Sequence, residues 1–305
     1  MTINLSGLLL PITTPFAAGE SIDAAGLRTN LNKWNGIGLT GYVVLGSTGE
    51  RVNLDEQEYL EVIEITREAV PESKTFIVGA GQQSTRTTIK EIERAAAAGA
   101  QAALVITPNF YRSAITQAAL LNHYRTIADA TKIPILLYSM PDLTGVKIEP
   151  ETAAQLSEHE NIIGIKDSSN EVEKFRETVK ACREDFAVMI GNGTVFADAL
   201  SAGARGGILA VGCCAPELCL SIYQVFQAGD ETRANDLQNR LTPLARAVTK
   251  TYGIGGLKVA MEMAGFAGGA VRAPLRRPTR DACAEIETLL RAAMMSAPGA
   301  VATGS

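Results

Sequence analysis

One lysine lies inside an apolar segment that is typical of a buried strand, "NIIGIKDSS" (161–169). Burying an ammonium group without a compensating partner is costly, so Lys166 calls for a chemical explanation. Side chains along a strand alternate between its faces, which places Lys166 with Ile162 and Gly164 on one face and Ile163 with Ile165 on the other. If the two isoleucines pack against helices, Lys166 points into the interior. Desolvation lowers the pKa of a lysine amine, and the neutral amine can then attack a carbonyl carbon and form a Schiff base.

A Schiff base on Lys166 would support carbon–carbon bond chemistry. The iminium group withdraws electrons from the adjacent carbon, so a carbon–carbon bond can be made or broken without a metal. The alternative is a structural lysine that pairs with Asp167 or extends to the rim of the fold. The spacing of the residues alone favours neither interpretation.

Two further groups favour the chemical interpretation. Tyr138 ends the preceding apolar segment, "IPILLYS" (133–139), and a phenol in that place can pass protons beside the amine, although it can also simply fill space. In "GSTGE" (46–50), the hydroxyls of Ser47 and Thr48 and the backbone N–H groups of the turn suit a carboxylate. The segment "KDS" adds the hydroxyl of Ser168 as a further candidate for substrate binding.

These residues all follow short apolar segments that are rich in β-branched residues and bounded by turn residues. Segments with helical spacing lie between them, for example residues 54–70 and 84–99. Strands without a polar face predict a parallel sheet covered by helices, and eight such units predict an α/β fold, the (β/α)8 TIM barrel. An open doubly wound sheet is the alternative. The predicted strands are residues 7–13, 41–46, 75–81, 102–108, 133–139, 162–167, 186–191 and 206–212.

The remaining chain has helical spacing and no further strand-like segment. We expect a catalytic barrel over residues 1–228, a helical C-terminal region over 229–296 and a flexible tail over 297–305. Helices that bury a large apolar face often form contacts between subunits, so we also expect an oligomer.

Composition excludes several classes of function. The two histidines, His123 and His159, fall in predicted helices or at helix ends, whereas catalytic residues of such barrels follow the strands. This argues against Ser-His-Asp hydrolysis and histidine-bound metals. Five cysteines without a CxxC pair predict no zinc site and no disulfide framework. A net charge of −5 without a basic cluster argues against nucleic acid as a partner. The start of the chain carries no membrane segment, which predicts a cytoplasmic protein.

The three motifs "GSTGE", "YSMPDLTG" and "IIGIKDSS" resemble, in order and spacing, the dihydrodipicolinate synthase and N-acetylneuraminate lyase family of class I aldolases, over about residues 6–290. The resemblance implies a TIM barrel with C-terminal helices, a homotetramer built as a dimer of dimers, and pyruvate bound to a lysine. By matching motif, Lys166 is the Schiff-base lysine, Tyr138 relays protons, and Ser47 with Thr48 holds the pyruvyl carboxylate. Gly191 and Ile208 match positions whose backbone faces the active site.

The sequence departs from the synthases of this family at two places. Their strand 5 motif usually contains an arginine that binds the carboxylate of the second substrate, and Leu143 stands here instead. An aliphatic side chain cannot replace a bidentate guanidinium. The synthases also have two tyrosines after "TP", of which the second reaches the proton relay of a neighbouring subunit. Asn109 and Phe110 occupy these places, and Tyr111 follows one residue later as the candidate phenol.

Within the family, the overall resemblance is to 4-hydroxy-2-oxoglutarate aldolases, which share a C-terminal "GI.GLK", here Gly253–Lys258, followed by "RAPL", here Arg272–Leu275. Sialic acid lyases carry acidic residues after strand 7, where this chain has Gly193 and Thr194.

We therefore predict a class I aldolase without a cofactor other than the Schiff base on Lys166. It would cleave a 4-hydroxy-2-oxo acid, such as 4-hydroxy-2-oxoglutarate, to pyruvate and an aldehyde such as glyoxylate. The first alternative is 4-hydroxy-tetrahydrodipicolinate synthase, which condenses pyruvate with aspartate semialdehyde. The second is a keto-acid-binding protein without turnover on a retained aldolase scaffold.

Overall fold

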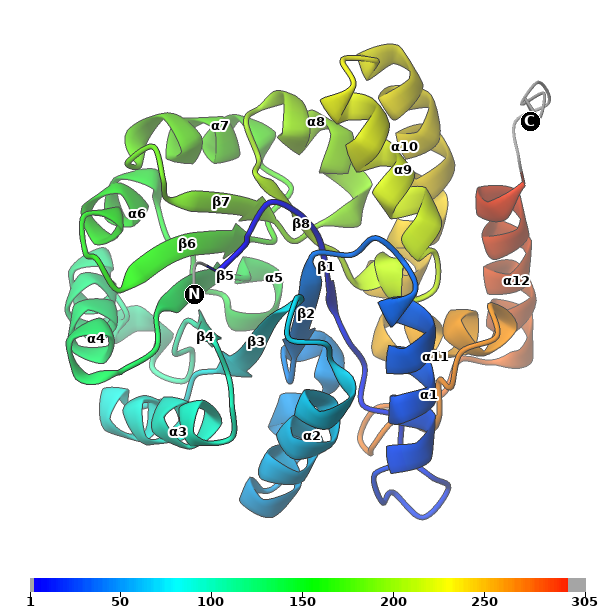
Figure 1. Ribbon diagram of the computed structural model, residues 1–305, viewed down its shortest axis with the longest axis horizontal. Coiled ribbons are helices and arrows are strands. Elements are labelled where there is room, and N and C mark those ends of the chain that lie inside the picture. The colour runs from blue at the N-terminus through cyan, green and yellow to red at the C-terminus, as the bar shows by residue number, and fades with distance from the viewer. Residues whose placement is uncertain (1–2, 296–305) are drawn as a thin grey trace.

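The computed structural model describes residues 3–295, and its centre is a closed barrel of parallel strands in the order β1 to β8 (Figure 1). The prediction of a TIM barrel is confirmed, and the open sheet is excluded. The strands are β1 (Gly7–Pro11), β2 (Gly41–Val44), β3 (Thr75–Ala80), β4 (Ala102–Ile106), β5 (Ile135–Ser139), β6 (Ile162–Asp167), β7 (Ala187–Ile190) and β8 (Gly206–Ile208).

Most of the strands end before the apolar segments that predicted them. The segment 206–212 is an example, since β8 ends at Ile208 and residues Ala210–Cys213 form a 3-10 turn. The predicted strand at 41–46 likewise ends at Val44, before the 3-10 turn Ser47–Gly49. Apolar composition therefore extends into the turns at the carboxyl end of the barrel, where the candidate side chains lie.

Helices surround the barrel (Figure 1). Ser84 caps α3, as expected for a residue whose hydroxyl accepts from a backbone N–H of the first turn. The helices are α1 (Ala24–Asn35), α2 (Glu56–Ala69), α3 (Thr85–Ala97), α4 (Gln117–Ala130), α5 (Pro141–Thr144), α6 (Pro150–Ser157), α7 (Val172–Ala181), α8 (Phe196–Ser201), α9 (Pro216–Gln227), α10 (Glu231–Arg246), α11 (Gly253–Met263) and α12 (Arg280–Met294).

The strands separate two apolar layers. Outward side chains such as Leu10, Val78 and Ile165 pack with the helices, and inward side chains such as Leu9 and Leu136 fill the barrel. Both layers are almost fully buried, which explains why the strands are apolar at nearly every position.

Strand β6 contains an irregularity that corrects the predicted facing of its isoleucines. Ile135 pairs with Ile162, whereas the next residue of β5 pairs with Gly164, so Ile163 is an extra residue in the register. As a result Ile162 packs toward the helices and Ile163 toward the barrel interior, which is the reverse of the prediction. Alternation resumes at Gly164, so Ile165 faces the helices as predicted and Lys166 faces inward.

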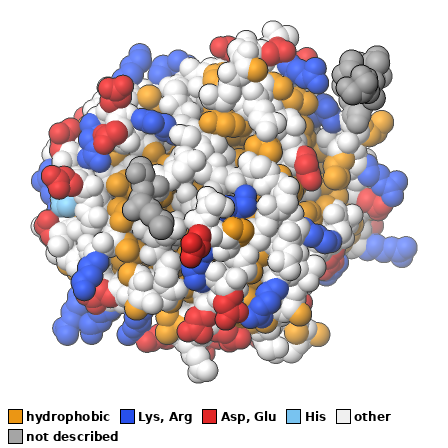
Figure 2. Space-filling view, viewed as in Figure 1, with side chains coloured by type: hydrophobic (Ala, Val, Ile, Leu, Met, Phe, Trp, Pro, Cys, Tyr) orange, Lys and Arg blue, Asp and Glu red, His pale blue; other side chains and the backbone are white. Residues whose placement is uncertain are grey.

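The C-terminal region is helical, as predicted. Between Ile208 and Met295 the described chain forms no strand; α10 packs on α9 and α12, and α11 also packs on α12. The predicted tail at 297–305 lies outside the described residues. Side chains of both charges are spread around the rim of the face seen in Figure 2. No helix within residues 3–295 is long and apolar enough to cross a membrane.

Candidate active site

The side chain of Lys166 lies inside the barrel near the carboxyl end of β6. It is 4% exposed, and its register partners on either side are Tyr138 and Met189, two residues of the barrel interior. The Nζ atom lies 4.3 Å from the centroid of the Tyr138 ring. Asp167 does not pair with it, because that carboxylate accepts a hydrogen bond of 2.7 Å from the backbone N–H of Ser169. The structural alternatives of an Asp167 pair or a rim lysine are therefore excluded.

Tyr138 brings a phenol to the same place. Its hydroxyl oxygen lies 3.5 Å from Oγ of Ser47, and the residue is buried. Burial alone would raise the pKa of the Tyr138 phenol, since the phenolate would lose solvation. The ammonium charge of Lys166 and hydrogen bonds from Ser47, Ser168 and Lys166 outweigh burial, and the pKa lies below the ordinary value of 10. The amine and the phenol are therefore electrostatically coupled.

The "GSTGE" segment forms the turn that follows β2. Ser47–Gly49 is a 3-10 turn. Leu45, two residues before it, and Glu50, directly after it, both have left-handed backbones, with φ of 58° and 55°. Such conformations cost about 1–3 kcal/mol in a residue with a side chain and persist only where the surroundings impose them. The Thr14 hydroxyl imposes part of the shape by donating a hydrogen bond of 2.8 Å to the carbonyl of Gly49. Ser47 of this turn reaches the hydroxyl of Tyr138.

Gly191 leaves the space that Lys166 occupies. A side-chain carbon built on Gly191 would lie 2.0 Å from Oγ of Ser168 and 2.7 Å from Cε of Lys166. Its N–H donates to the carbonyl of Asp167 at 2.6 Å, which joins the ends of β6 and β7. The structure thus brings Gly191 and Ser168 to the amine. Ile208 is buried in the barrel interior and pairs with Leu9 at the other side of the closure.

Tyr111 and Leu143 are not brought to the amine within this chain. Tyr111 is 72% exposed, and its ring packs on Phe110 with 5.0 Å between centroids. Leu143 is 60% exposed on the short helix α5. A role for either residue as a contact of the bound substrate therefore remains a prediction.

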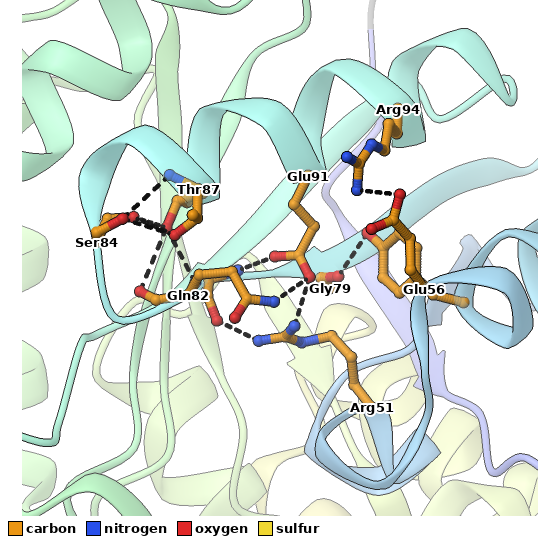
Figure 3. A network of polar contacts seen from close by, with 11 residues as sticks. Arg51, Glu56, Gly79, Gln82, Ser84, Thr87, Glu91 and Arg94 are labelled. Carbon is orange, nitrogen blue, oxygen red and sulfur yellow. Dashed lines mark hydrogen bonds and ion pairs between the residues drawn. The ribbon is translucent and has the colours of Figure 1, made fainter.

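A small pocket of about 40 Å³ between Ser47 and Tyr138 adjoins a larger cavity of about 640 Å³. Figure 3 shows the wall of the larger cavity, where Arg51 lies against Glu91, with 2.5 Å between Nη1 and Oε1. The other carboxylate oxygen of Glu91 accepts from the N–H of Gly81 at 2.7 Å. Because Ser47 and Tyr138 line the smaller pocket and not the larger cavity, we place the chemistry at the smaller pocket.

The two histidines lie in the helical layer, as expected. His123 hydrogen-bonds to Thr85 at 2.8 Å, and His159 lies 3.0 Å from Asp129. No cluster of three or more residues suited to a metal ion occurs among the described residues.

Sequence reasoning missed one buried charge pair beside the site, Glu50 with Lys258. It treated Lys258 only as part of a family motif. A lysine in the middle of the apolar segment "GLKVAM" (256–261) was the available signal, since a buried ammonium needs a partner.

We predict that Gly191→Ala slows Schiff-base formation on Lys166. The added methyl group cannot fit unless Ser168 and Lys166 move, and a displacement of this kind reduces rates by roughly 10- to 100-fold. The measurement is the rate of borohydride trapping with pyruvate. Gly19→Ala is the matched control, because nothing lies within 4 Å of a side-chain carbon there. Trapping at the wild-type rate in Gly191→Ala would contradict the placement of the amine.

We also predict that Lys166→Met raises the pKa of Tyr138, because burial then acts without the opposing ammonium charge. The ammonium charge favours the phenolate in the wild type, so in the variant the ultraviolet absorption of the phenolate should appear at higher pH. Subtracting the titration of the matching Tyr138→Phe proteins isolates this phenol from the other tyrosines. An unchanged midpoint for Tyr138 would show that the two groups are not coupled.

The sequence matches the Dihydrodipicolinate synthetase family over residues 4–293. A 4-hydroxy-tetrahydrodipicolinate synthase of Mesorhizobium japonicum is 33% identical over 294 residues, which cover 94% of this chain and 98% of that protein. Six further curated relatives, at 32–35% identity, carry the same name. These relatives favour the predicted alternative, a synthase, over the predicted resemblance to 4-hydroxy-2-oxoglutarate aldolases.

Two solved structures share the fold. A dihydrodipicolinate synthase from Bacillus anthracis has a TM-score of 0.91 at 26% identity, covering 95% of this chain and 99% of that one. A prophage protein of E. coli K12 from the dihydrodipicolinic acid synthase family, solved in complex with pyruvate, has a TM-score of 0.88 at 26% identity, covering 95% and 98%. With the match over nearly the whole chain, this protein belongs to the dihydrodipicolinate synthetase family of pyruvate-dependent class I lyases.

Proposed function

We propose that the protein binds pyruvate as a Schiff base on Lys166 and joins it to, or releases it from, an aldehyde. The observation that carries this proposal is the buried amine of Lys166 beside the phenol of Tyr138, without a carboxylate partner for the amine within residues 3–295. The pyruvate complex of the E. coli relative supports the choice of oxo acid.

Each group near the amine has a proposed role. The amine attacks the ketone carbon of pyruvate, water leaves, and an iminium forms. Loss of a proton from the methyl carbon gives an enamine, which adds to the aldehyde carbon, while the aldehyde oxygen takes up a proton. Tyr138, with the Ser47 hydroxyl 3.5 Å away, is placed to move these protons. Ser47 and Thr48 would hold the carboxylate through their hydroxyls and the N–H groups of the turn.

For the second substrate, we propose aspartate semialdehyde as the first candidate. The support is the shared name of the curated relatives, 4-hydroxy-tetrahydrodipicolinate synthase. A 4-hydroxy-2-oxo acid, cleaved to pyruvate and an aldehyde such as glyoxylate, is the second candidate. Leu143 favours the second candidate, because it stands where the synthases usually have a carboxylate-binding arginine.

Arg112 offers a cation near Leu143. A side-chain carbon built on Gly145, two residues after Leu143, would lie 2.9 Å from Nη1 of Arg112. The guanidinium of Arg112 has no hydrogen-bond or ion-pair partner within the described chain. A hydrogen bond of 3.1 Å between the hydroxyls of Thr107 and Thr144 joins the loop after β4, which carries Arg112, to helix α5, which carries Leu143. We propose that Arg112 binds the carboxylate of the second substrate, which both candidate aldehydes carry.

We also propose a homotetramer, with Tyr111 at a subunit contact. The adjacent Phe110 is 75% exposed, and two neighbouring exposed aromatic side chains are what a subunit contact would cover.

The Schiff base can be tested directly. Borohydride reduction in the presence of pyruvate should add a mass increment to the peptide that contains Lys166, and Lys166→Met should show no increment while remaining folded. The control variant is Lys147→Met. Lys147 lies in a loop at the carboxyl end of the barrel but pairs with Glu171 at 2.5 Å, so this variant should be labelled on Lys166 as the wild type is. Labelling of another lysine, or none, contradicts the proposal. Labelling without turnover of any aldehyde would instead support the keto-acid-binding alternative.

The second substrate requires a comparison of rates. We expect the wild type to condense pyruvate with aspartate semialdehyde faster than it releases pyruvate from 4-hydroxy-2-oxoglutarate; the opposite order would assign the aldolase activity. Arg112→Met should raise KM for the second substrate by about 10- to 100-fold, because a hydrogen bond to a charged group contributes about 1.5–3 kcal/mol. Arg125→Met, an exposed arginine on α4, is the matched control. Equal KM values in the two variants would contradict the role of Arg112.

A further inference from the structure

A fully buried ion pair connects the turn after β2 to the C-terminal helices. The side chains of Glu50 and Lys258 are each 1% exposed, and Oε1 of Glu50 lies 2.6 Å from Nζ of Lys258. The two groups form an ion pair, and Oε1 of Glu50 has no other partner among the described residues. The two residues lie in the motifs "GSTGE" and "GLK", which are far apart in the sequence.

On the side of the turn, Glu50 directly follows the carboxylate-binding candidates. Its N–H donates to the carbonyl of Ser47 at 3.2 Å, which closes the 3-10 turn. Its own backbone is left-handed, with φ of 55°. This conformation aims the side chain away from the turn, toward α11. A shift of the Glu50 carboxylate is therefore a shift of the turn that carries Ser47 and Thr48.

On the other side, the C-terminal region supplies Lys258 and Arg272. Nζ of Lys258 also donates to the carbonyl of Ala270 at 2.5 Å and lies 4.5 Å from the centroid of the Phe16 ring. The backbone N–H of Arg272, in the second C-terminal motif, donates to Oε2 of Glu50 at 3.2 Å. The Arg272 guanidinium in turn lies 4.3 Å from the same ring of Phe16. Each carboxylate oxygen of Glu50 thus contacts one of the two C-terminal motifs.

Stability alone is a weak reason for such a pair. Transferring two charges from water to the protein interior costs about as much free energy as their mutual attraction contributes. Apolar residues of similar volume often replace a buried pair without loss of stability. An ion pair differs from apolar packing in fixing the position of its partners. The left-handed residues at both ends of the turn also indicate a backbone that its surroundings hold in place.

We infer that Glu50, Lys258 and Arg272 are positioning residues, which hold the turn Ser47–Gly49 in the geometry that binds the pyruvate carboxylate. The C-terminal region is then part of the pyruvate site, although none of its residues touches the amine. This inference rests on the proposed function of Lys166 and extends it, because it names what fixes the carboxylate contacts.

The test separates positioning from simple stabilisation. We measure the pyruvate concentration that gives half-maximal borohydride trapping on Lys166, the trapping rate at saturation, and the thermal unfolding midpoint. The variants are Glu50→Gln, Lys258→Met and the double variant. Leu257→Ala is the matched control, since it removes fully buried apolar contacts from the same helix without touching the ion pair.

If the pair positions the turn, each single variant raises the half-saturating pyruvate concentration by about tenfold or more, with a smaller change in the rate at saturation. The half-saturating pyruvate concentration of the double variant should not exceed the higher of the two single-variant values, because both changes remove the same interaction. Leu257→Ala should lower the unfolding midpoint and leave half-saturation unchanged. Should a single variant fail to fold, the double variant carries the test, because it leaves no unpaired buried charge.

Two outcomes overturn the inference, and they are distinguishable. If the wild type and the variants all trap pyruvate on Lys166 with the same half-saturation, while only the unfolding midpoint falls, the pair is structural and the proposed function stands. If the wild type gives no adduct on Lys166, the proposed function fails and the positioning role fails with it.

Discussion

The site depends on the burial of one ammonium group inside a closed barrel. Lys166 faces a largely apolar interior, and the aromatic ring that its amine contacts is the phenol of Tyr138. The closed parallel sheet makes this possible, because every strand ends at the same rim and brings its following turn toward the amine. The glycine at 191 leaves room for the side chain, and the turn after β2 brings the hydroxyl of Ser47 within reach of the phenol.

The same charge governs the chemistry of the phenol. Burial and the ammonium group act on the pKa of Tyr138 in opposite directions, and the ammonium group together with the hydrogen bonds is the stronger influence. A protonated Schiff base also carries a positive charge. The phenol therefore remains beside a cation before and after the proposed covalent step, which keeps a proton transfer through Tyr138 accessible in both states.

Sequence patterns predicted the barrel and the inward direction of Lys166, because alternation and apolar runs are local properties of strands. They predicted the wrong facing for Ile162 and Ile163, since an extra residue in the register leaves no mark on residue type. The contact between Glu50 and Lys258 could not be predicted from local patterns, because the two residues are far apart in the sequence. Only the complete fold places α11, which carries Lys258, beside the turn. Motif resemblance brought the same residues to attention without saying that they touch.

That long-range contact has a consequence for the order in which the molecule becomes complete. Synthesis delivers a chain from its N-terminus onward, and a domain generally folds as a unit. The barrel strands, Lys166 and the turn at residues 46–50 all precede α11 in the chain, so the carboxylate of Glu50 meets its cation only when the last quarter of the protein has emerged and docked. Until then, the turn lacks an ionic anchor and the amine has no finished site around it. The turn that carries Ser47 and Thr48 therefore gains its ionic anchor only when α11 has docked beside it.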